Sequence, residues 1–199
     1  MADTLVRRSP LHGYESRFAR LPESARVIDE PFIAMVDLWI DPAGPGGAAA
    51  ADVLGLDALP TTPSTIVAGR DTSVIWLGPE EWLVTSEHRD GEDLETTLRD
   101  AVSEHGGAAV EVSAQRTTLR LWGAHARDVI AKGCSLDLHP AVFGQGAAAQ
   151  TVLGHAGMVL IPLSDNGSDF RIIVRSSFAR YLADWLIDAA EEFGVDGRS

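Results

Sequence analysis

The chain has 199 residues, of which 45% are hydrophobic, so it is long enough to bury one sizeable core. Its formal net charge of −13 at pH 7 argues against nucleic-acid binding, because phosphate contacts need clustered Lys or Arg and the only lysine is Lys132. The single cysteine, Cys134, excludes an intrachain disulfide and is typical of a reducing compartment. No apolar run reaches the roughly 20 residues that cross a bilayer, so we expect a cytoplasmic protein without a membrane partner.

The N-terminal stretch combines arginines with few large apolar side chains, and Ser9-Pro10 disfavours helix before it. We therefore expect an extended N-terminal arm over residues 1–26, which either frays in solvent or lies along a partner, and the sequence pattern by itself favours fraying. The nearly continuous apolar run Phe32–Ile40 then predicts a strand that is buried on both faces and ends at Asp41-Pro42.

The next segment is organised around a predicted hairpin. A short helix is expected over Ala48–Leu54, ended by Gly55, followed by a strand at 65–68. Two apolar runs then flank Gly78-Pro79-Glu80-Glu81, where Pro79 fixes φ for a tight turn. The alternation of strand side chains allows Trp76 and Trp82 to share one face of this hairpin.

Residues 91–105 have acidic residues in the first turn and apolar residues at helical spacing, which predicts an amphipathic helix. A strand begins at Val110 and resumes through Leu121, but its apolar parity switches, so a bulge or break is expected over Ser113–Arg116. A shorter helix follows over 124–132, and the chain between 136 and 150 reads as irregular.

The C-terminal part predicts two strands, at 158–163 and 170–174, joined by a turn at Asn166-Gly167. The longest helix is expected over 178–193, capped by Ser176 or Ser177 and ended by Gly194. The order of elements is similar in outline in residues 27–109 and 110–199. We therefore predict an α+β fold in which two sheet-and-helix halves share a core and form one structural unit.

The sequence contains no pattern that predicts catalysis. The histidines are scattered without a ligand at metal-binding spacing, and the loop at 165–169 has Ser176 where a calcium loop needs glutamate. Cys134 has His139 nearby only in sequence, and Glu80 and Glu81 read as solvated turn carboxylates. The residues therefore predict no catalytic, cofactor-binding or metal-ligating site in this chain.

Several blocks that span almost the whole chain resemble the gamma subunit of heterotetrameric sarcosine oxidase. They are Arg8–Leu11, Leu77–Leu83, Val112-Ser113 leading into Arg116–Leu121, Ala131–Pro140 with Phe143, and Arg175–Ala179 before Tyr181 and Trp185. This resemblance implies a fold like the folate-binding domain of aminomethyltransferase-like proteins. It also implies a complex that oxidatively demethylates sarcosine to glycine.

The resemblance further implies that alpha, beta and delta subunits are the partners and that these carry FAD, FMN, NAD and tetrahydrofolate, while this chain carries no cofactor. Where folate-using relatives have an aspartate, this chain has Glu111. The alternative is a free-standing folate-dependent aminomethyltransferase-like or folate-binding protein. Because an arginine-rich segment resists burial in its own core, we expect an interface with a larger subunit at Arg7, Arg8, Ser9, Pro10 and Leu11.

Overall fold

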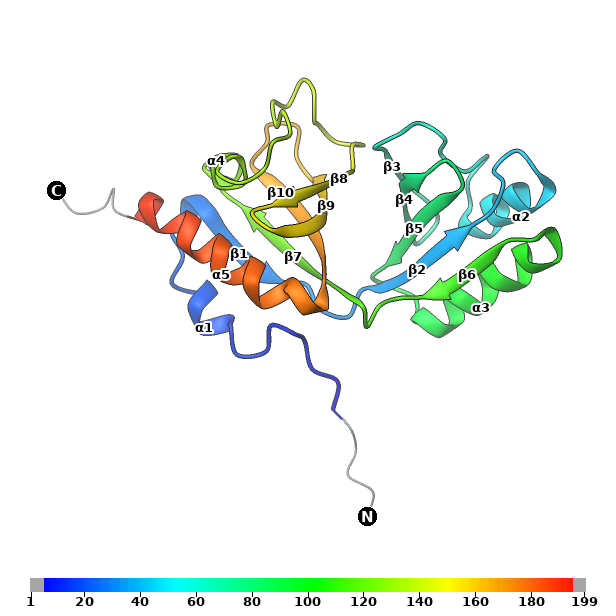
Figure 1. Cartoon of the computed structure of the whole chain (residues 1–199), viewed down its shortest axis with the longest axis horizontal. Coiled ribbons are helices and arrows are strands. Elements are labelled where there is room, and N and C mark those ends of the chain that lie inside the picture. The colour runs from blue at the N-terminus through cyan, green and yellow to red at the C-terminus, as the bar shows by residue number, and fades with distance from the viewer. Residues whose placement is uncertain (1–5, 195–199) are drawn as a thin grey trace, which may run out of the picture.

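The computed structural model describes residues 6–194, which form two five-stranded antiparallel sheets with helices on their outer sides (Figure 1). Sheet A has the strand order β1 (Arg26–Asp29), β7 (Arg116–Trp122), β10 (Asp169–Arg175), β9 (Ala156–Pro162) and β8 (Ala149–Leu153). Sheet B has the order β3 (Ile66–Ala68), β4 (Ser73–Gly78), β5 (Glu81–Ser86), β2 (Ala34–Trp39) and β6 (Ala108–Glu111). This architecture confirms the predicted α+β class with two sheet-and-helix units.

The helices divide between the two sheets. Sheet A is accompanied by α1 (Glu15–Phe18), α4 (Ala126–Ala131) and α5 (Ala179–Ala190), and sheet B by α2 (Pro45–Leu54) and α3 (Gly91–Val102). Short 3-10 turns are η1 (Glu23–Ala25), η2 (Ser103–His105), η3 (Ser176–Phe178) and η4 (Glu191–Gly194). Helix α3 begins where the Asp90 side chain accepts hydrogen bonds from the N–H groups of Glu92 and Asp93, as an N-cap does.

Helix α2 begins three residues earlier than predicted. Pro45 occupies the first turn, where its missing N–H costs nothing, and Gly55 ends the helix in the left-handed conformation. Gly46 and Gly47 lie inside the helix because the chain packs closely there: a Cβ on Gly46 would lie 2.6 Å from Ile40 Cδ1. The weak helix propensity of glycine is outweighed by this close packing.

The hairpin of β4 and β5 confirms the central prediction from the sequence. Trp76 and Trp82 pair directly across the two strands and therefore share a face. Trp82 is 0% exposed in the core between sheet B and helices α2 and α3, and its Nε1–H donates to the carbonyl of Pro60 at 2.8 Å.

The break predicted near Ser113–Arg116 is confirmed, and its role is to carry the chain from sheet B to sheet A. Strand β6 ends at Glu111, and β7 begins at Arg116 in the other sheet. Within this crossing the N–H of Met35 donates a hydrogen bond to the Ser113 hydroxyl at 2.8 Å. Here the hydroxyl oxygen is the acceptor, so a side chain completes the hydrogen bonding at the point where the sheet ladder is interrupted.

Two strands, β1 and β8, were not predicted, and their positions change the division of the chain. Strand β1 pairs with β7 in sheet A although it precedes sheet B in the chain, and the expected boundary between 109 and 110 falls inside β6. We call residues 6–29 and 116–194 half A, and residues 34–111 half B. Half A therefore includes residues 6–29, which lie outside the predicted range 110–199. Half B covers 34–111 instead of the predicted 27–109.

The predicted extended arm also differs from the structure. Residues 15–18 form α1, and the side chains of Leu11, Phe18 and Leu21 are buried in the core of half A. At the other end, Ser176 and Ser177 do not cap α5, whose N-cap Phe178 has no side-chain hydrogen bond. The Ser176 hydroxyl instead donates to the carbonyl of Ala114 at 2.9 Å.

A third group of buried side chains lies between the two sheets, which we call the central core. It contains residues from both halves: Ile33, Met35, Ile75, Leu77, Leu83, Val112, Ala148, Val159, Ile161 and Ile173. The inner faces of the sheets thus pack on one another while their outer faces pack on helices. The two halves share this apolar layer as well as their own cores.

Candidate functional site

The N-terminal segment, the predicted interface, belongs to half A, where it contacts β1 and α5, and it divides into two parts. Arg7 and Arg8 are exposed, whereas Leu11 is 1% exposed within the core of half A. The Ser9 hydroxyl donates to Asp29, and the carbonyl of Pro10 accepts from Arg180 Nε at 3.2 Å. Ser9, Pro10 and Leu11 are therefore held by their own chain, which sequence reasoning missed because it considered the charge of the arginines before the burial of Leu11.

Beside this segment the chain exposes large apolar side chains. Phe32 is 47% exposed and Ile28 is 41% exposed, and the guanidinium of Arg7 lies 4.7 Å from the centre of the Phe32 ring. Phe32 has φ of +68°, a left-handed conformation that bulky residues seldom adopt. The sequence placed Phe32 at the start of a buried strand, but this conformation turns it outward before β2 begins.

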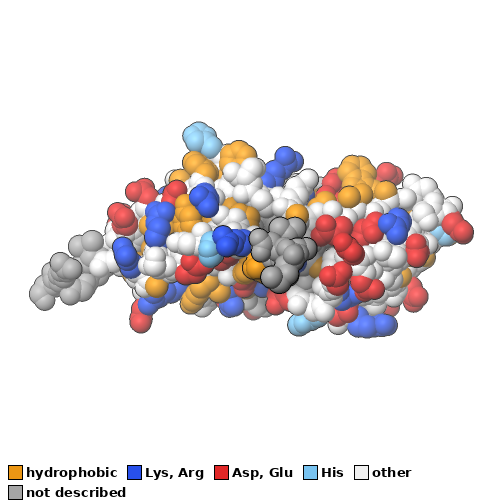
Figure 2. All heavy atoms as spheres, turned by 90° about the horizontal axis from the view of Figure 1, so that it is seen from below, with side chains coloured by type: hydrophobic (Ala, Val, Ile, Leu, Met, Phe, Trp, Pro, Cys, Tyr) orange, Lys and Arg blue, Asp and Glu red, His pale blue; other side chains and the backbone are white. Residues whose placement is uncertain are grey.

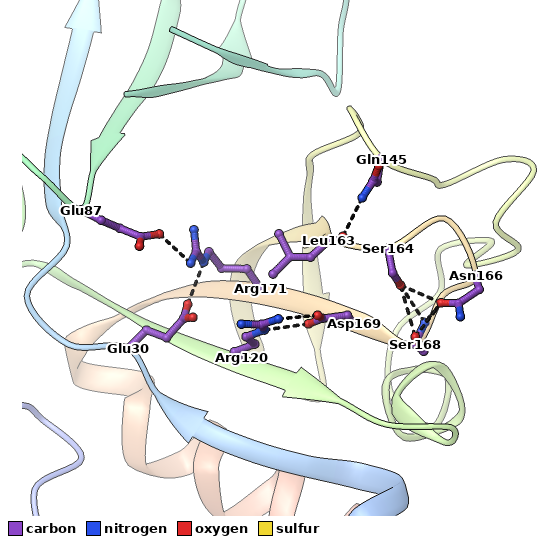
Figure 3. A network of polar contacts seen from close by, with 10 residues as sticks. All are labelled: Glu30, Glu87, Arg120, Gln145, Leu163, Ser164, Asn166, Ser168, Asp169 and Arg171. Carbon is purple, nitrogen blue, oxygen red and sulfur yellow. Dashed lines mark hydrogen bonds and ion pairs between the residues drawn. The ribbon is translucent and has the colours of Figure 1, made fainter. Parts of the chain in front are cut away.

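A network of charged side chains joins the two halves (Figure 3). Arg171 of β10 contacts Glu30 through Nε at 2.7 Å and Glu87 through Nη2 at 2.8 Å. Glu30 follows β1, whereas Glu87 follows β5 of sheet B. Burial disfavours the charged guanidinium of Arg171, but its bonds to the two glutamates outweigh this and raise its pKa.

Below Arg171 in the same sheet, Arg120 and Asp169 form a two-pronged ion pair across β7 and β10. The Nε–Oδ1 and Nη2–Oδ2 distances are 2.9 and 2.6 Å. The hydrogen bond with Asp169 raises the pKa of Arg120. The Arg120–Asp169 pair therefore joins neighbouring strands of sheet A, and the Arg171–Glu87 contact is the part of the network that reaches sheet B.

A second charged group lies where the inner face of sheet B ends. Burial raises the pKa of Asp37, opposed by Arg116, whose Nη2 lies 3.8 Å from Asp37 Oδ1. Burial and the Asp37 charge also raise the pKa of Glu81, so this predicted turn carboxylate is coupled to a neighbour that the sequence did not indicate. Trp39, at 51% exposure, lies at the end of β2 opposite Glu81.

The remaining candidates from the sequence are placed apart from one another. The Cys134 sulfur lies 3.6 Å from the hydroxyl of Thr151, and the carboxylate of Glu111 accepts from the N–H of Ser113 at 3.0 Å. No three potential metal ligands come together among residues 6–194. Within the same range, no helix has both the length and the apolar character required to cross a membrane.

The face seen in Figure 2 carries both signs of charge, with hydrophobic side chains in scattered patches between them. Acidic side chains gather over half B, on the right of that view.

The chain is similar in sequence to known proteins over almost its whole length. The chain is 34% identical to sarcosine oxidase subunit gamma of Corynebacterium sp. (strain U-96), covering 96% of this chain and 94% of that protein. It is 31% identical to the corresponding subunit of Arthrobacter sp, covering 96% and 93%.

Solved structures give the same result at the level of the fold. Heterotetrameric sarcosine oxidase from Corynebacterium sp. U-96, in complex with pyrrole 2-carboxylate, contains a chain that matches with a TM-score of 0.87 and 31% identity. The match covers 98% of this chain and 100% of that one. Aminomethyltransferase T of the Bartonella henselae glycine cleavage system matches with a TM-score of 0.60 and 15% identity, over 89% of this chain and 49% of that one, which confirms the expected fold.

The family model described as the sarcosine oxidase, gamma subunit family matches residues 39–192, which is more than half of the chain. Together with near full-length relatives above 30% identity, this match shows that the chain belongs to the sarcosine oxidase gamma subunit family.

Proposed function

We propose that this chain is a non-catalytic subunit of a heterotetrameric, cytoplasmic sarcosine oxidase and that it stabilises the subunits that carry the flavins. The observation that carries the proposal is the match over 98% of this chain to all of one chain in a heterotetrameric sarcosine oxidase. The exposed apolar side chains beside the N-terminal segment support it, because such groups favour burial against a partner. Alpha, beta and delta subunits would be the partners and would hold FAD, FMN, NAD and tetrahydrofolate.

The pairing of charges in this chain supports a structural contribution. The Arg171 and Arg120 guanidinium groups are both engaged by carboxylates of the same chain. The contact of Arg171 with Glu87 links sheet A to the end of β5 in sheet B, whereas the Arg120–Asp169 pair joins two strands of sheet A. Together they support the shape that a partner would meet. A general acid or base needs instead a group that can exchange its proton with a substrate.

The second candidate is a folate-binding protein that acts on its own, favoured by the similarity of fold to an aminomethyltransferase. Glu111 argues against it. Its carboxylate is already used by the N–H of Ser113 at the crossing between the sheets, and it is one methylene longer than the aspartate expected in folate-using relatives.

The experiment expresses this chain alone and together with the other subunits of its enzyme. Alone, it should be colourless and should not oxidise sarcosine. Together, it should copurify with the flavin-containing subunits, and leaving it out should lower their yield, flavin content or melting temperature. Stoichiometric flavin or sarcosine turnover in the isolated chain would contradict the proposal, as would a flavin complex that is unchanged without it.

We also propose that the exposed part of the N-terminal segment contributes to the interface. Arg7 and Arg8 would contact the partner, while Ser9, Pro10 and Leu11 hold the segment in place. Arginine is enriched at interfaces because its guanidinium pairs with carboxylates in a fixed geometry. The double substitution of Arg7 and Arg8 by alanine should weaken assembly without changing the melting temperature of the isolated chain, whereas unchanged assembly would show that these arginines are solvated.

A further inference from the structure

One edge of sheet A is left without a neighbouring strand. Strand β1 is at the end of the sheet, and the N–H of Glu30 donates to the carbonyl of Thr118 at 2.9 Å. In an antiparallel pair, alternate residues point their main-chain groups toward the partner. Given the register of Ile28 with Arg120, the N–H and C=O groups of Val27 and Asp29 face the free edge.

A groove of about 500 Å³ runs along this free edge between α1 and β1, and we call it the β1 groove. Its lining is mostly apolar and includes Leu11, Phe18, Ile28, Pro31 and Trp122. A smaller hollow of about 200 Å³ shares Pro31 with the groove and is lined by Phe32. The free main-chain groups therefore lie beside space that side chains can fill.

Two carboxylates and one guanidinium, that of Arg26, line the β1 groove, so negative charge is in excess there. Glu15 lines it from α1, and Asp29 lines it from β1. One oxygen of Asp29 accepts from Ser9, whereas Oδ1 is buried and has no hydrogen-bond partner among residues 6–194. An unsatisfied buried acceptor is costly, and a donor that enters the groove would remove this cost.

Phe32 supplies an independent observation at the end of the groove. Its left-handed backbone is strained for a bulky residue, and its aromatic side chain is 47% exposed. Strain of this kind persists where the surrounding structure or a ligand uses it.

We propose that the β1 groove binds an extended segment of another subunit of the complex, which adds a strand along the free edge of β1. The segment places an apolar side chain in the groove and a Lys or Arg beside Glu15 and Asp29. This inference rests on the proposed function, because it needs a partner subunit. Strand addition obtains affinity from main-chain hydrogen bonds and specificity from pockets for alternate side chains.

The charge of the site favours a different subunit over a second copy of this chain. A symmetric contact between two copies would bring two grooves together, each lined by two carboxylates and only one guanidinium, that of Arg26. With a net charge of −13, the whole chain adds to this repulsion. A segment that carries a basic side chain meets no such penalty.

The first test compares matched substitutions on the two edge strands of sheet A in the coexpressed complex. Ile28→Glu places a charge at the β1 groove, and Val152→Glu places the same charge on β8, where Val152 is 50% exposed. Affinity for the flavin-containing subunits should fall at least tenfold for Ile28→Glu and less than twofold for Val152→Glu. Equal effects of the two substitutions would overturn the proposal.

The second test follows amide hydrogen exchange in the isolated chain and in the complex. The amides of Val27 and Asp29 should exchange quickly in the isolated chain and at least tenfold more slowly after assembly. Unchanged exchange in the complex would overturn the proposal. Protection already present in an isolated chain that dimerises would show that a second copy occupies the groove, and this too would overturn it.

These outcomes separate the inference from the proposed function. A chain that fails to copurify with flavin-containing subunits contradicts the proposed function itself. A chain that copurifies, yet tolerates Ile28→Glu and leaves Val27 and Asp29 unprotected, contradicts only the placement of the partner at β1.

Discussion

Half B is built from one unbroken stretch, 34–111, whereas half A combines residues 6–29 with residues 116–194. Both halves have a five-stranded antiparallel sheet with helices outside. Half B nevertheless obtains all of its strands locally, while half A obtains β1 and Leu11 from the far end of the chain. The two halves therefore share an architecture but complete their cores differently, half B from one continuous segment and half A from two separate segments. The substitutions below test this difference.

The largest effect is expected in half B. Trp82→Ala removes a 0% exposed indole and its hydrogen bond to Pro60, so the free energy of unfolding should fall by about 3–5 kcal/mol. Urea denaturation of the isolated chain measures this, with the half-exposed Trp39→Ala as control. A midpoint that hardly moves would show that Trp82 contributes little to the core.

The same experiment bears on whether the chain is one structural unit. We propose that it is, because the central core takes side chains from both halves. Loss of Trp82 should then shift a single transition seen by every probe. Two separate transitions would show that half A and half B unfold independently.

The next effect tests the discontinuous half. Leu11→Ala should lower the free energy of unfolding by about 2–5 kcal/mol, because the side chain is buried with Phe18 and Leu21 in the core of half A. The exposed Arg8→Ala serves as control and should change stability by less than about 0.5 kcal/mol. If Leu11→Ala is as harmless as Arg8→Ala, the N-terminal segment is not part of half A.

A smaller effect is expected from the link between the halves. Arg171→Met leaves Glu30 partly buried without its cation, so stability should fall by about 1–3 kcal/mol. The exposed Arg175→Met on the same strand is the matched control. Equal melting temperatures for the two variants would show that the ion pairs of Arg171 do not hold the sheets together.

The smallest effect concerns the surface of half A. Burial raises the pKa of Asp29, opposed by its hydrogen bond from Ser9, so ionisation of Asp29 favours the unfolded chain. Asp29→Asn keeps an acceptor for Ser9 and should raise stability at pH 7 by less than about 1 kcal/mol, since solvent screens the partly exposed group.

The sign of the pH dependence follows from this raised pKa. Below the ordinary aspartate pKa of about 3.9, Asp29 is protonated in both states and the variant should lose its advantage. The advantage should appear as pH rises through the pKa of the folded state. Chemical denaturation at pH 4 and pH 7, with the exposed Asp52→Asn as control, measures the difference, and an advantage that is larger at pH 4 would contradict this assignment.

The elements that could be predicted from the sequence are those whose signals are local. The β4–β5 hairpin has its turn residues and both tryptophans within a few positions, and α3 has an acidic first turn and an amphipathic face. Strand β1 has only four residues of mixed polarity, and its partner β7 lies about 90 residues later in the chain. No local sequence pattern predicts that β1 pairs with β7.

The candidate site was less predictable because it depends on backbone conformation and on residues brought together by the fold. Phe32 belongs to an apolar run in the sequence, yet its positive φ turns it to solvent. Pro31 just before it was the available signal, since proline constrains the residues around it. Nothing in the spacing of Glu30, Glu87 and Arg171 indicated that they meet.

The pairing of β1 with β7 also sets an order of events during synthesis. At typical rates of about 5–20 residues per second, β1 leaves the ribosome roughly 5–18 s before β7, because about 90 residues separate them. Half B can fold in that interval, whereas β1 cannot pair until β7 has been synthesised. Because the lining of the β1 groove includes Trp122 as well as residues of α1 and β1, the groove is complete only after β7 has paired with β1.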